Sequence, residues 1–369
     1  MTSARILIST GEASGDAVGA KLLEEMRMLG FSGKAYAVGS TRLREAGAEI
    51  IADSSTWGAL GVYQAVKKAP RLLAGGFGVK KWVKANMPDM VVAIDFGFMN
   101  VRLCRHAKKL GIKTFYFLPP GSWRRDRAGG DLPNICDRIA TQFTWSERLL
   151  REKGANVEWV GHPVRQMVGK VPLMQDRTLL AVLPGSRRHE IELNLPVMAR
   201  AVGLLGHLGG LRVRIACAPN TDALWVSGLW SRNCAVPAEI SRDGAVNALR
   251  EARAAIVCSG TATLEAAVCK TPMVVVYVLD RLMVAEAKLI RLKFDYIAQP
   301  SILLNRLVAP ELFYVNATPE RIAEEIRPLL IQGSTAQKQQ LGDFEEIDAL
   351  LGPDDAITRA AKIAIDLLS

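Results

Sequence analysis

The stretch that decides the fold is AAIVCSGTATLEAAVCKTPMVVVYV, residues 254–278. Two apolar runs rich in β-branched residues enclose a small polar turn and a short helical segment, which predicts a buried strand, a helix and a second buried strand. A turn between two strands needs only one small or polar residue, whereas this turn and the helix after it carry five: Ser259, Gly260, Thr261, Thr263 and Glu265.

Two explanations account for this turn. In the first, Gly260 permits an unusual backbone angle and Ser259 or Thr261 caps the helix, without any ligand. In the second, amide groups at the helix N-terminus bind phosphate with help from the neighbouring hydroxyls. Glu265 favours a whole nucleotide, because a carboxylate near a diphosphate is repelled unless it accepts hydrogen bonds from sugar hydroxyls.

The same alternation of apolar runs and helical stretches, such as 19–29 and 101–110, continues along the chain and predicts parallel sheets with crossover helices. The further runs are RILIST (5–10), KAYAVG (34–39), MVVAID (90–95), KTFYFL (113–118), RIATQF (138–143), VEWVGH (157–162), LLAVLPGS (179–186) and RVRIACAP (212–219). They form two series, which predicts an α/β protein with Rossmann-like domains at 1–165 and 175–345. An amphipathic helix at about 353–369 is expected to pack back on the first domain, and a ligand is expected at the carboxyl ends of the strands.

Composition indicates a soluble globular protein, since 49% of the 369 residues are hydrophobic and 23% are charged. The six cysteines show no Cys-x-x-Cys pair and no metal-site spacing, so we expect free thiols in a reducing cytoplasm. The N-terminal run reads as a first strand and not as a signal peptide, and no run reaches the roughly 18 apolar residues of a membrane span. We therefore expect a cytoplasmic protein, unless it lies on a membrane surface.

The net charge of +10 is concentrated in one region. Residues 54–125 contain thirteen Lys and Arg against two acids, and Trp57, Phe77 and Trp82 are interleaved with them. This pattern suits an anionic membrane surface or a nucleic acid. A solvated basic face over a core is an equally good explanation, and nucleic acid is the weakest because no recognised binding motif accompanies the charge.

Polar residues also follow strands of the first domain. STGEASGD (9–16) places Glu12 and Ser14 after the first strand, but it matches neither the dinucleotide fingerprint nor a phosphate-binding loop, so a plain glycine turn is an alternative. Asp95 ends the strand MVVAI (90–94). It is either a helix cap or hydrogen-bond anchor, or a general base if desolvation raises its pKa.

In the second domain, LPGSRRHEIE (183–192) places Ser186 and Arg187 between a strand and a helix. An arginine beside such a loop suits a diphosphate, because the guanidinium binds phosphate oxygens in a fork. The alternative is an ion pair with Glu190 or Glu192.

The chain resembles the lipid-A-disaccharide synthase family, inverting glycosyltransferases of the GT-B type, along nearly its whole length. Six motifs in order carry the resemblance: GEASGD (11–16), PDMVVAID (88–95), VGHP (160–163), LPGSRRHEIE (183–192), SGTATLEAAVCKTPMVV (259–275) and LLNRLVAPEL (303–312).

The resemblance implies transfer of an acylated glucosamine from UDP onto the 6-hydroxyl of an acylated glucosamine 1-phosphate, without metal or cofactor. It implies Asp95 as the catalytic residue, and UDP contacts from Ser186, Arg187, Ser259, Gly260, Thr261, Ala262 and Glu265. It also implies acceptor or sugar contacts from Glu12, Ser14, Trp123 and Asn305. The implied partners are a UDP-sugar, a lipid-linked acceptor and the anionic inner face of the cell membrane, with no nucleic acid; a homodimer is left open.

The chain departs from the family pattern at Gly97, Phe98, Pro120, Gly121 and Ser301, and all but the last lie on the acceptor side. The donor half of the resemblance is therefore firmer than the acceptor half. Three alternatives stay open: a UDP-sugar-binding protein without transfer activity, a UDP-sugar epimerase, and a GT-B transferase with a different acceptor.

Overall fold

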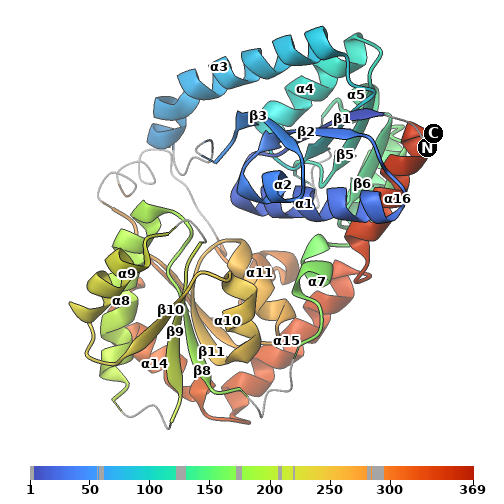
Figure 1. Cartoon of the computed structure of the whole chain (residues 1–369). Coiled ribbons are helices and arrows are strands. Elements are labelled where there is room, and N and C mark those ends of the chain that lie inside the picture. Colours follow the sequence, from blue (N-terminus) through green and yellow to red (C-terminus); the bar gives the residue numbers. More distant parts are fainter. Residues whose placement is uncertain are drawn as a thin grey trace. The chain divides into compact units, whose positions relative to one another are not determined.

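The computed structural model describes residues 4–55, 57, 62–121, 130–171, 177–206, 210–218, 221–280, 284 and 295–369, with side chains omitted for 62–71. The chain divides into two compact units, Met1–Met167 together with Leu351–Ser369, and Val168–Leu350 (Figure 1). Each unit contains one parallel sheet with helices on both faces.

The first unit has a seven-stranded sheet in the order β3-β2-β1-β4-β5-β6-β7, and every pairing is parallel. Its strands are β1 (Arg5–Ser9), β2 (Lys34–Gly39), β3 (Glu49–Asp53), β4 (Met90–Ile94), β5 (Lys113–Phe117), β6 (Arg138–Thr141) and β7 (Val157–Trp159). Its helices are α1 (Ala13–Met28), α2 (Thr41–Glu45), α3 (Val62–Asn86), α4 (Gly97–Lys109), α5 (Leu132–Ile135), α6 (Thr144–Glu152), α7 (Pro163–Val168) and α16 (Ala356–Leu368).

Both faces of this sheet are buried, which is why β4 is apolar at all five positions. Ile6 and Val92 pack on one face with α1 and α16, while Leu7 and Val91 pack on the other with α3 and α4. The C-terminal helix α16 lies beside α1 (Figure 1) and buries Ile357, Ala360, Ala361, Ile363 and Ala364 in the same core.

The second unit has a six-stranded parallel sheet in the order β10-β9-β8-β11-β12-β13. Its strands are β8 (Leu179–Leu183), β9 (Arg212–Ala216), β10 (Ala238–Ser241), β11 (Ala252–Cys258), β12 (Met273–Tyr277) and β13 (Glu311–Phe313). Its helices are α8 (Arg188–Leu204), α9 (Ala223–Ser231), α10 (Ala245–Glu251), α11 (Thr261–Val268), α13 (Gln299–Leu304), α14 (Pro319–Leu330) and α15 (Thr335–Leu351), with a 3₁₀ turn at Tyr314–Asn316.

The strand order reverses once in each unit, between β1 and β4 and between β8 and β11. At such a point the two neighbouring strands lead their chains away in opposite directions, so the loops after them diverge and leave room for a ligand. The predicted polar residues in the described chain follow these four strands, except Asn305, which follows α13 (Gln299–Leu304).

The prediction of strand, turn, helix and strand over 254–278 is confirmed by β11, α11 and β12. Three strands were missed: β3, β10 and β13. All three are short edge strands with partly exposed sequences, so they need few apolar residues and give little periodic signal. No helix in the described part of the chain is both long and apolar enough to span a bilayer.

Candidate active site

The turn after β11 is built around Gly260, which has φ +152° and ψ −160°, a conformation available essentially only to glycine. Ser259 does not cap α11, because its hydroxyl donates to the carbonyl of Ile297 at 2.7 Å. No described side chain caps the N-terminus of α11, so the first of the two explanations is wrong about capping. The first amide groups of the helix, at Thr261 and Ala262, are therefore available to a ligand.

Glu265 lies one turn into α11 and is half-buried. Burial raises the pKa of its carboxyl from 4.5 to about 7. A ligand that donates hydrogen bonds to this carboxylate would favour the charged form, as sugar hydroxyls do.

The loop after β8 already binds an anionic group, the carboxylate of Glu190. Glu190 Oε2 accepts hydrogen bonds from the backbone amides of Ser186 at 3.0 Å and Arg187 at 3.2 Å, while Oε1 pairs with Arg187 Nη1 at 2.7 Å. The ion pair with Glu190, given above as the alternative role for Arg187, is thus present. The same contacts show that the loop amides and the guanidinium converge on one oxyanion.

A buried asparagine that the sequence analysis missed, Asn194 of α8, joins three strand ends of this unit. Its Nδ2 donates to the carbonyl of Pro184 at 3.3 Å and to Cys258 Sγ at 3.4 Å, and its Oδ1 accepts from the amide of Val278 at 2.9 Å. The loops after β8 and β11 are therefore fixed to each other.

The start of α13 also reaches the turn after β11, because the amide of Gln299 donates to Thr263 Oγ1 at 3.2 Å. Asn305 lies at the other end of this helix, in the left-handed conformation with φ +54°, and is exposed. Ser301 is buried and accepts a hydrogen bond from the amide of Val308, so this departure from the family pattern lies inside the fold. The structure thus brings Gln299 to the turn, and a role for Asn305 stays a prediction.

In the first unit, Glu12 and Ser14 lie exposed at the start of α1, and Asp95 follows the adjacent strand β4. Desolvation by the surrounding protein raises the pKa of Asp95, and the negative charge of Glu12 adds to the rise, against a hydrogen bond from the amide of Phe96. The Asp95 residue is itself exposed, so contact with water limits this rise of its pKa. The loops after β1 and β4 therefore bring two carboxylates close together.

Two glycines in these loops are required by close packing. A Cβ at position 11 would lie 2.0 Å from Phe96 Cγ, and one at position 97 would lie 2.5 Å from Pro120 Cβ. The departures Gly97 and Pro120 thus fit each other. Phe98 is 50% exposed and lies under the guanidinium of Arg102, 4.3 Å from the ring centroid, while Gly121 has φ +73°. Trp123 lies outside the described residues.

In the basic and aromatic region, two of the three aromatic rings named above pack on the core, as in the explanation of a basic face over a core. Trp57 is only 7% exposed and packs beside Gly75 and Phe96, and Trp82 is half-buried against Tyr36. These two rings belong to the core because α3 covers the sheet. The large apolar side chains of Phe77 and Leu73, in contrast, are 73% and 61% exposed. They lie on α3 near the exposed Lys81 and Lys84.

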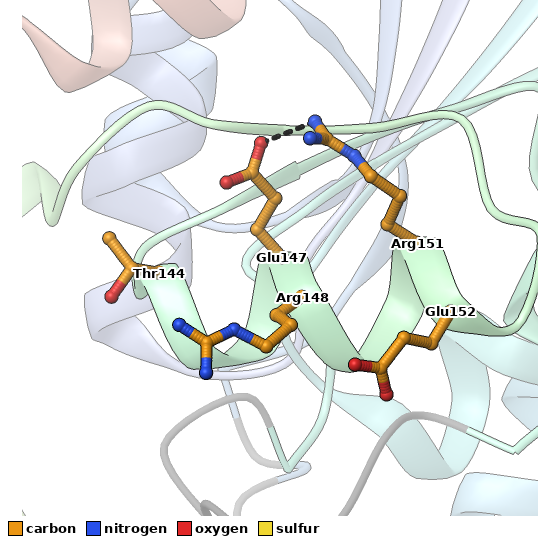
Figure 2. Close-up of a pocket in the computed structure, with 5 residues that line it drawn as sticks. All are labelled: Thr144, Glu147, Arg148, Arg151 and Glu152. Carbon is orange, nitrogen blue, oxygen red and sulfur yellow. Dashed lines mark hydrogen bonds and ion pairs between the residues drawn. The ribbon is translucent and has the colours of Figure 1, made fainter.

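A separate surface hollow of about 370 Å³ lies on α6 and is lined by Thr144, Glu147, Arg148, Arg151 and Glu152 (Figure 2). Glu147 and Arg151 form an ion pair across one turn of that helix at 2.7 Å. The hollow contains none of the predicted site residues. Among the residues that the structure describes, no group of three or more His, Cys, Asp or Glu is arranged to hold a metal ion.

Comparison with known proteins gives consistent matches. A family model described as lipid-A-disaccharide synthetase matches residues 6–359. The chain is similar to lipid-A-disaccharide synthase of Syntrophus aciditrophicus (strain SB), with 33% identity over 384 residues covering 100% of this chain and 99% of that protein. Among solved structures it is similar to the calicheamicin glycosyltransferase CalG4 (TM-score 0.59, 15% identity, 100% and 99% of the two chains covered). It is also similar to S. aureus MnaA with UDP (TM-score 0.63, 12% identity, 99% and 97% covered). The predicted α/β fold of the GT-B type is confirmed.

The raised pKa of Glu265 predicts how stability changes with pH. A carboxyl whose pKa is higher in the folded state favours folding while it is protonated, so this contribution is lost as pH rises from about 4.5 to 7. Relative to Glu265→Gln, the wild-type protein should lose up to about 3 kcal/mol of unfolding free energy over that window. Urea unfolding of both proteins at pH 5 and pH 8 measures the difference. The exposed Glu324→Gln serves as the control, and an equal pH dependence in wild type and Glu265→Gln would contradict the prediction.

Proposed function

Because the chain belongs to the lipid-A-disaccharide synthetase family, we propose that it transfers an acylated glucosamine from UDP to the 6-hydroxyl of an acylated glucosamine 1-phosphate, with inversion. The family relationship makes it a UDP-sugar-dependent glycosyltransferase of lipid A synthesis. The observation that carries the finer proposal is Asp95, a carboxylate of raised pKa at the point where the strand order of the first unit reverses.

UDP is held in this proposal by the second unit. The amides of Thr261 and Ala262, with the open turn at Ser259 and Gly260, bind phosphate at the start of α11. The amide of Ser186 and the guanidinium of Arg187 bind the Glu190 carboxylate in the structure. In the proposed complex the diphosphate takes the place of this carboxylate. Glu265 accepts hydrogen bonds from the ribose. The Arg187 guanidinium and the amide donors stabilise the negative charge of the leaving UDP in this proposal, which includes no metal or cofactor.

The acceptor is activated in this proposal by the first unit. A sugar hydroxyl is a poor nucleophile, and its proton must leave as the new bond to the anomeric carbon forms. Asp95 takes that proton, because desolvation raises its pKa towards the working range of a general base. Glu12 and Ser14 are exposed beside it and bind acceptor or sugar hydroxyls, with Trp123 and Asn305 as further candidates from the family resemblance.

We place the protein at the inner face of the cell membrane, because an acylated acceptor resides in a bilayer. Phe77 and Leu73 of α3 supply an exposed apolar surface, and Lys81 and Lys84 supply positive charge next to it. In the described part of the chain, no acidic side chain forms an ion pair with either lysine, whereas Arg105 and Lys108 of α4 pair with Asp131 and Asp137.

The other readings differ from this proposal in their products. A non-catalytic binding protein releases no UDP, a UDP-sugar epimerase changes the sugar without an acceptor, and a transferase with another acceptor forms a different glycolipid. Incubation with UDP-linked acylated glucosamine and acylated glucosamine 1-phosphate, followed by mass spectrometry, separates these outcomes. Release of UDP together with a disaccharide glycolipid supports the proposal.

Arg187→Ala should weaken UDP binding by about 1.5–3 kcal/mol, which is roughly 10- to 150-fold, because a charged hydrogen bond to phosphate is lost. Titration calorimetry with UDP measures the affinity. Arg188→Ala is the matched control, since Arg188 instead pairs with Glu192 and lies over the Trp225 ring. Equal UDP affinity in Arg187→Ala and wild type would remove Arg187 from the site.

Asp95→Asn should lower turnover by about 100-fold or more while UDP affinity stays near that of wild type, because a general base acts only in the transition state. Turnover is measured as UDP release and affinity by calorimetry. Asp53→Asn is the control, since Asp53 ends β3 of the same sheet at an exposed position. Near-normal turnover of Asp95→Asn would exclude Asp95 as the base.

Binding to phosphatidylglycerol vesicles should fall as salt rises, since screening limits the reach of each charge to about 8 Å at physiological ionic strength. Phe77→Ser should weaken flotation at every salt concentration, and Lys81→Glu mainly at low salt. Leu224→Ser is the control, because Leu224 is 85% exposed in the second unit. If the wild-type protein does not float with the vesicles even at low salt, α3 is a solvent-exposed basic surface and does not bind the membrane.

A further inference from the structure

The chain leaves β4 through two consecutive non-glycine residues in the left-handed region, Asp95 with φ +47° and Phe96 with φ +46°. Left-handed backbone is unfavourable for L-residues with a side chain, so the surrounding structure must hold it. Such strain within a candidate site can serve to orient a functional side chain.

Asn100 of α4 is one group that holds this backbone. Its side chain is fully buried, and the two N–H groups of its Nδ2 are shared among the carbonyls of Ser9, Ile94 and Asp95, each at 3.0 Å. Its Oδ1 accepts from the Ser9 hydroxyl at 2.7 Å, which fixes the orientation of the amide. Burial of an amide is unfavourable unless it is hydrogen-bonded, and here every bond goes to the ends of β1 and β4.

Tyr116 of the neighbouring strand β5 is the second group. It is fully buried, and its hydroxyl donates to the same carbonyl of Asp95 at 2.7 Å. Burial raises the pKa of Tyr116 well above its ordinary value, so the hydroxyl remains a donor throughout the range of an activity assay.

Side-chain packing also constrains this turn. The Phe96 ring lies against Gly11, and Gly97 lies against Pro120, with no room for a Cβ at either glycine. The Asp95 amide also donates to the Phe117 carbonyl at 3.1 Å. The backbone of Asp95 is therefore held at both its amide and its carbonyl.

We propose that Asn100 and Tyr116 are positioning residues, which hold the Asp95 carbonyl so that the left-handed turn directs the Asp95 carboxylate at the acceptor hydroxyl. This inference rests on the proposed function of Asp95 as the base. A displacement of about 1 Å in a reacting group can lower the rate on the order of 100-fold, so a modest relaxation of the turn is enough to matter.

Tyr116→Phe is the decisive variant, because it removes only the hydroxyl and leaves the ring in the core. We expect kcat to fall about 10-fold, with the donor KM within about twofold of wild type and an unchanged stoichiometry of UDP binding. Thr114→Val is the matched control: Thr114 is buried on β5, and its hydroxyl bonds to the Ile135 carbonyl and to Asp137. It should leave kcat close to wild type.

A double-mutant cycle separates positioning from general structural damage. If Tyr116 acts through Asp95, Tyr116→Phe should have little further effect on turnover in an Asp95→Asn background. An equal loss in both backgrounds, or a loss matched by Thr114→Val, would overturn the inference. Normal turnover of Asp95→Asn alone would instead refute the proposed base, so the two failures are distinguishable.

Asn100→Asp tests the second positioning residue, because it keeps the volume but replaces the donating amide by a carboxylate. Its kcat should fall at least as far as that of Tyr116→Phe, with the UDP affinity retained. Wild-type kcat in a folded Asn100→Asp protein would overturn the role of Asn100. If this variant does not fold, the cycle with Tyr116→Phe still decides the inference.

Discussion

The reversal of strand order between β1 and β4, and between β8 and β11, is the constraint on which the rest of the structure depends. Parallel pairing brings the carboxyl ends of all strands in a sheet to one edge, and the reversal separates the two loops at its centre. Glu12 and Asp95 follow the central strands of the first unit, and Arg187 and Ser259 follow those of the second. The residues of the proposed site therefore lie where the loops after two adjacent strands diverge.

Buried asparagines hold both of these points together. Asn100 bonds to the ends of β1 and β4, while Asn194 bonds to residues that follow β8, β11 and β12. An apolar residue at either position would pack well but could not satisfy the strand-end carbonyls and amides, which are costly to bury without partners. In each sheet, a buried asparagine stands where an apolar side chain could pack, and its hydrogen bonds fix the arrangement of the loops.

The sequence predicts much of this arrangement, and what it misses has physical causes. Apolar runs that end in small polar residues locate the central strands and the turn at 259–265, because strands buried on both faces need continuous apolar sequence. Hydrogen-bond partners that are far apart in the sequence produce no such pattern. No local feature of the sequence indicates that the amide of Gln299 donates to Thr263, or that the Ser9 hydroxyl donates to Asn100. The sequence leaves the burial of Trp57 open, because charge and aromatic content do not reveal which ring α3 covers.

Two carboxylates of the proposed site, Asp95 and Glu265, have a raised pKa. Partial desolvation raises the pKa of each, and hydrogen-bond donors from a ligand would stabilise the charged form further. Ribose hydroxyls that bind Glu265 would lower its pKa from about 7, so that nucleotide binding near neutral pH releases protons. Asp95 differs, because the proposed base needs a pKa high enough to take a proton from the acceptor, and the negative charge of Glu12 raises its pKa further.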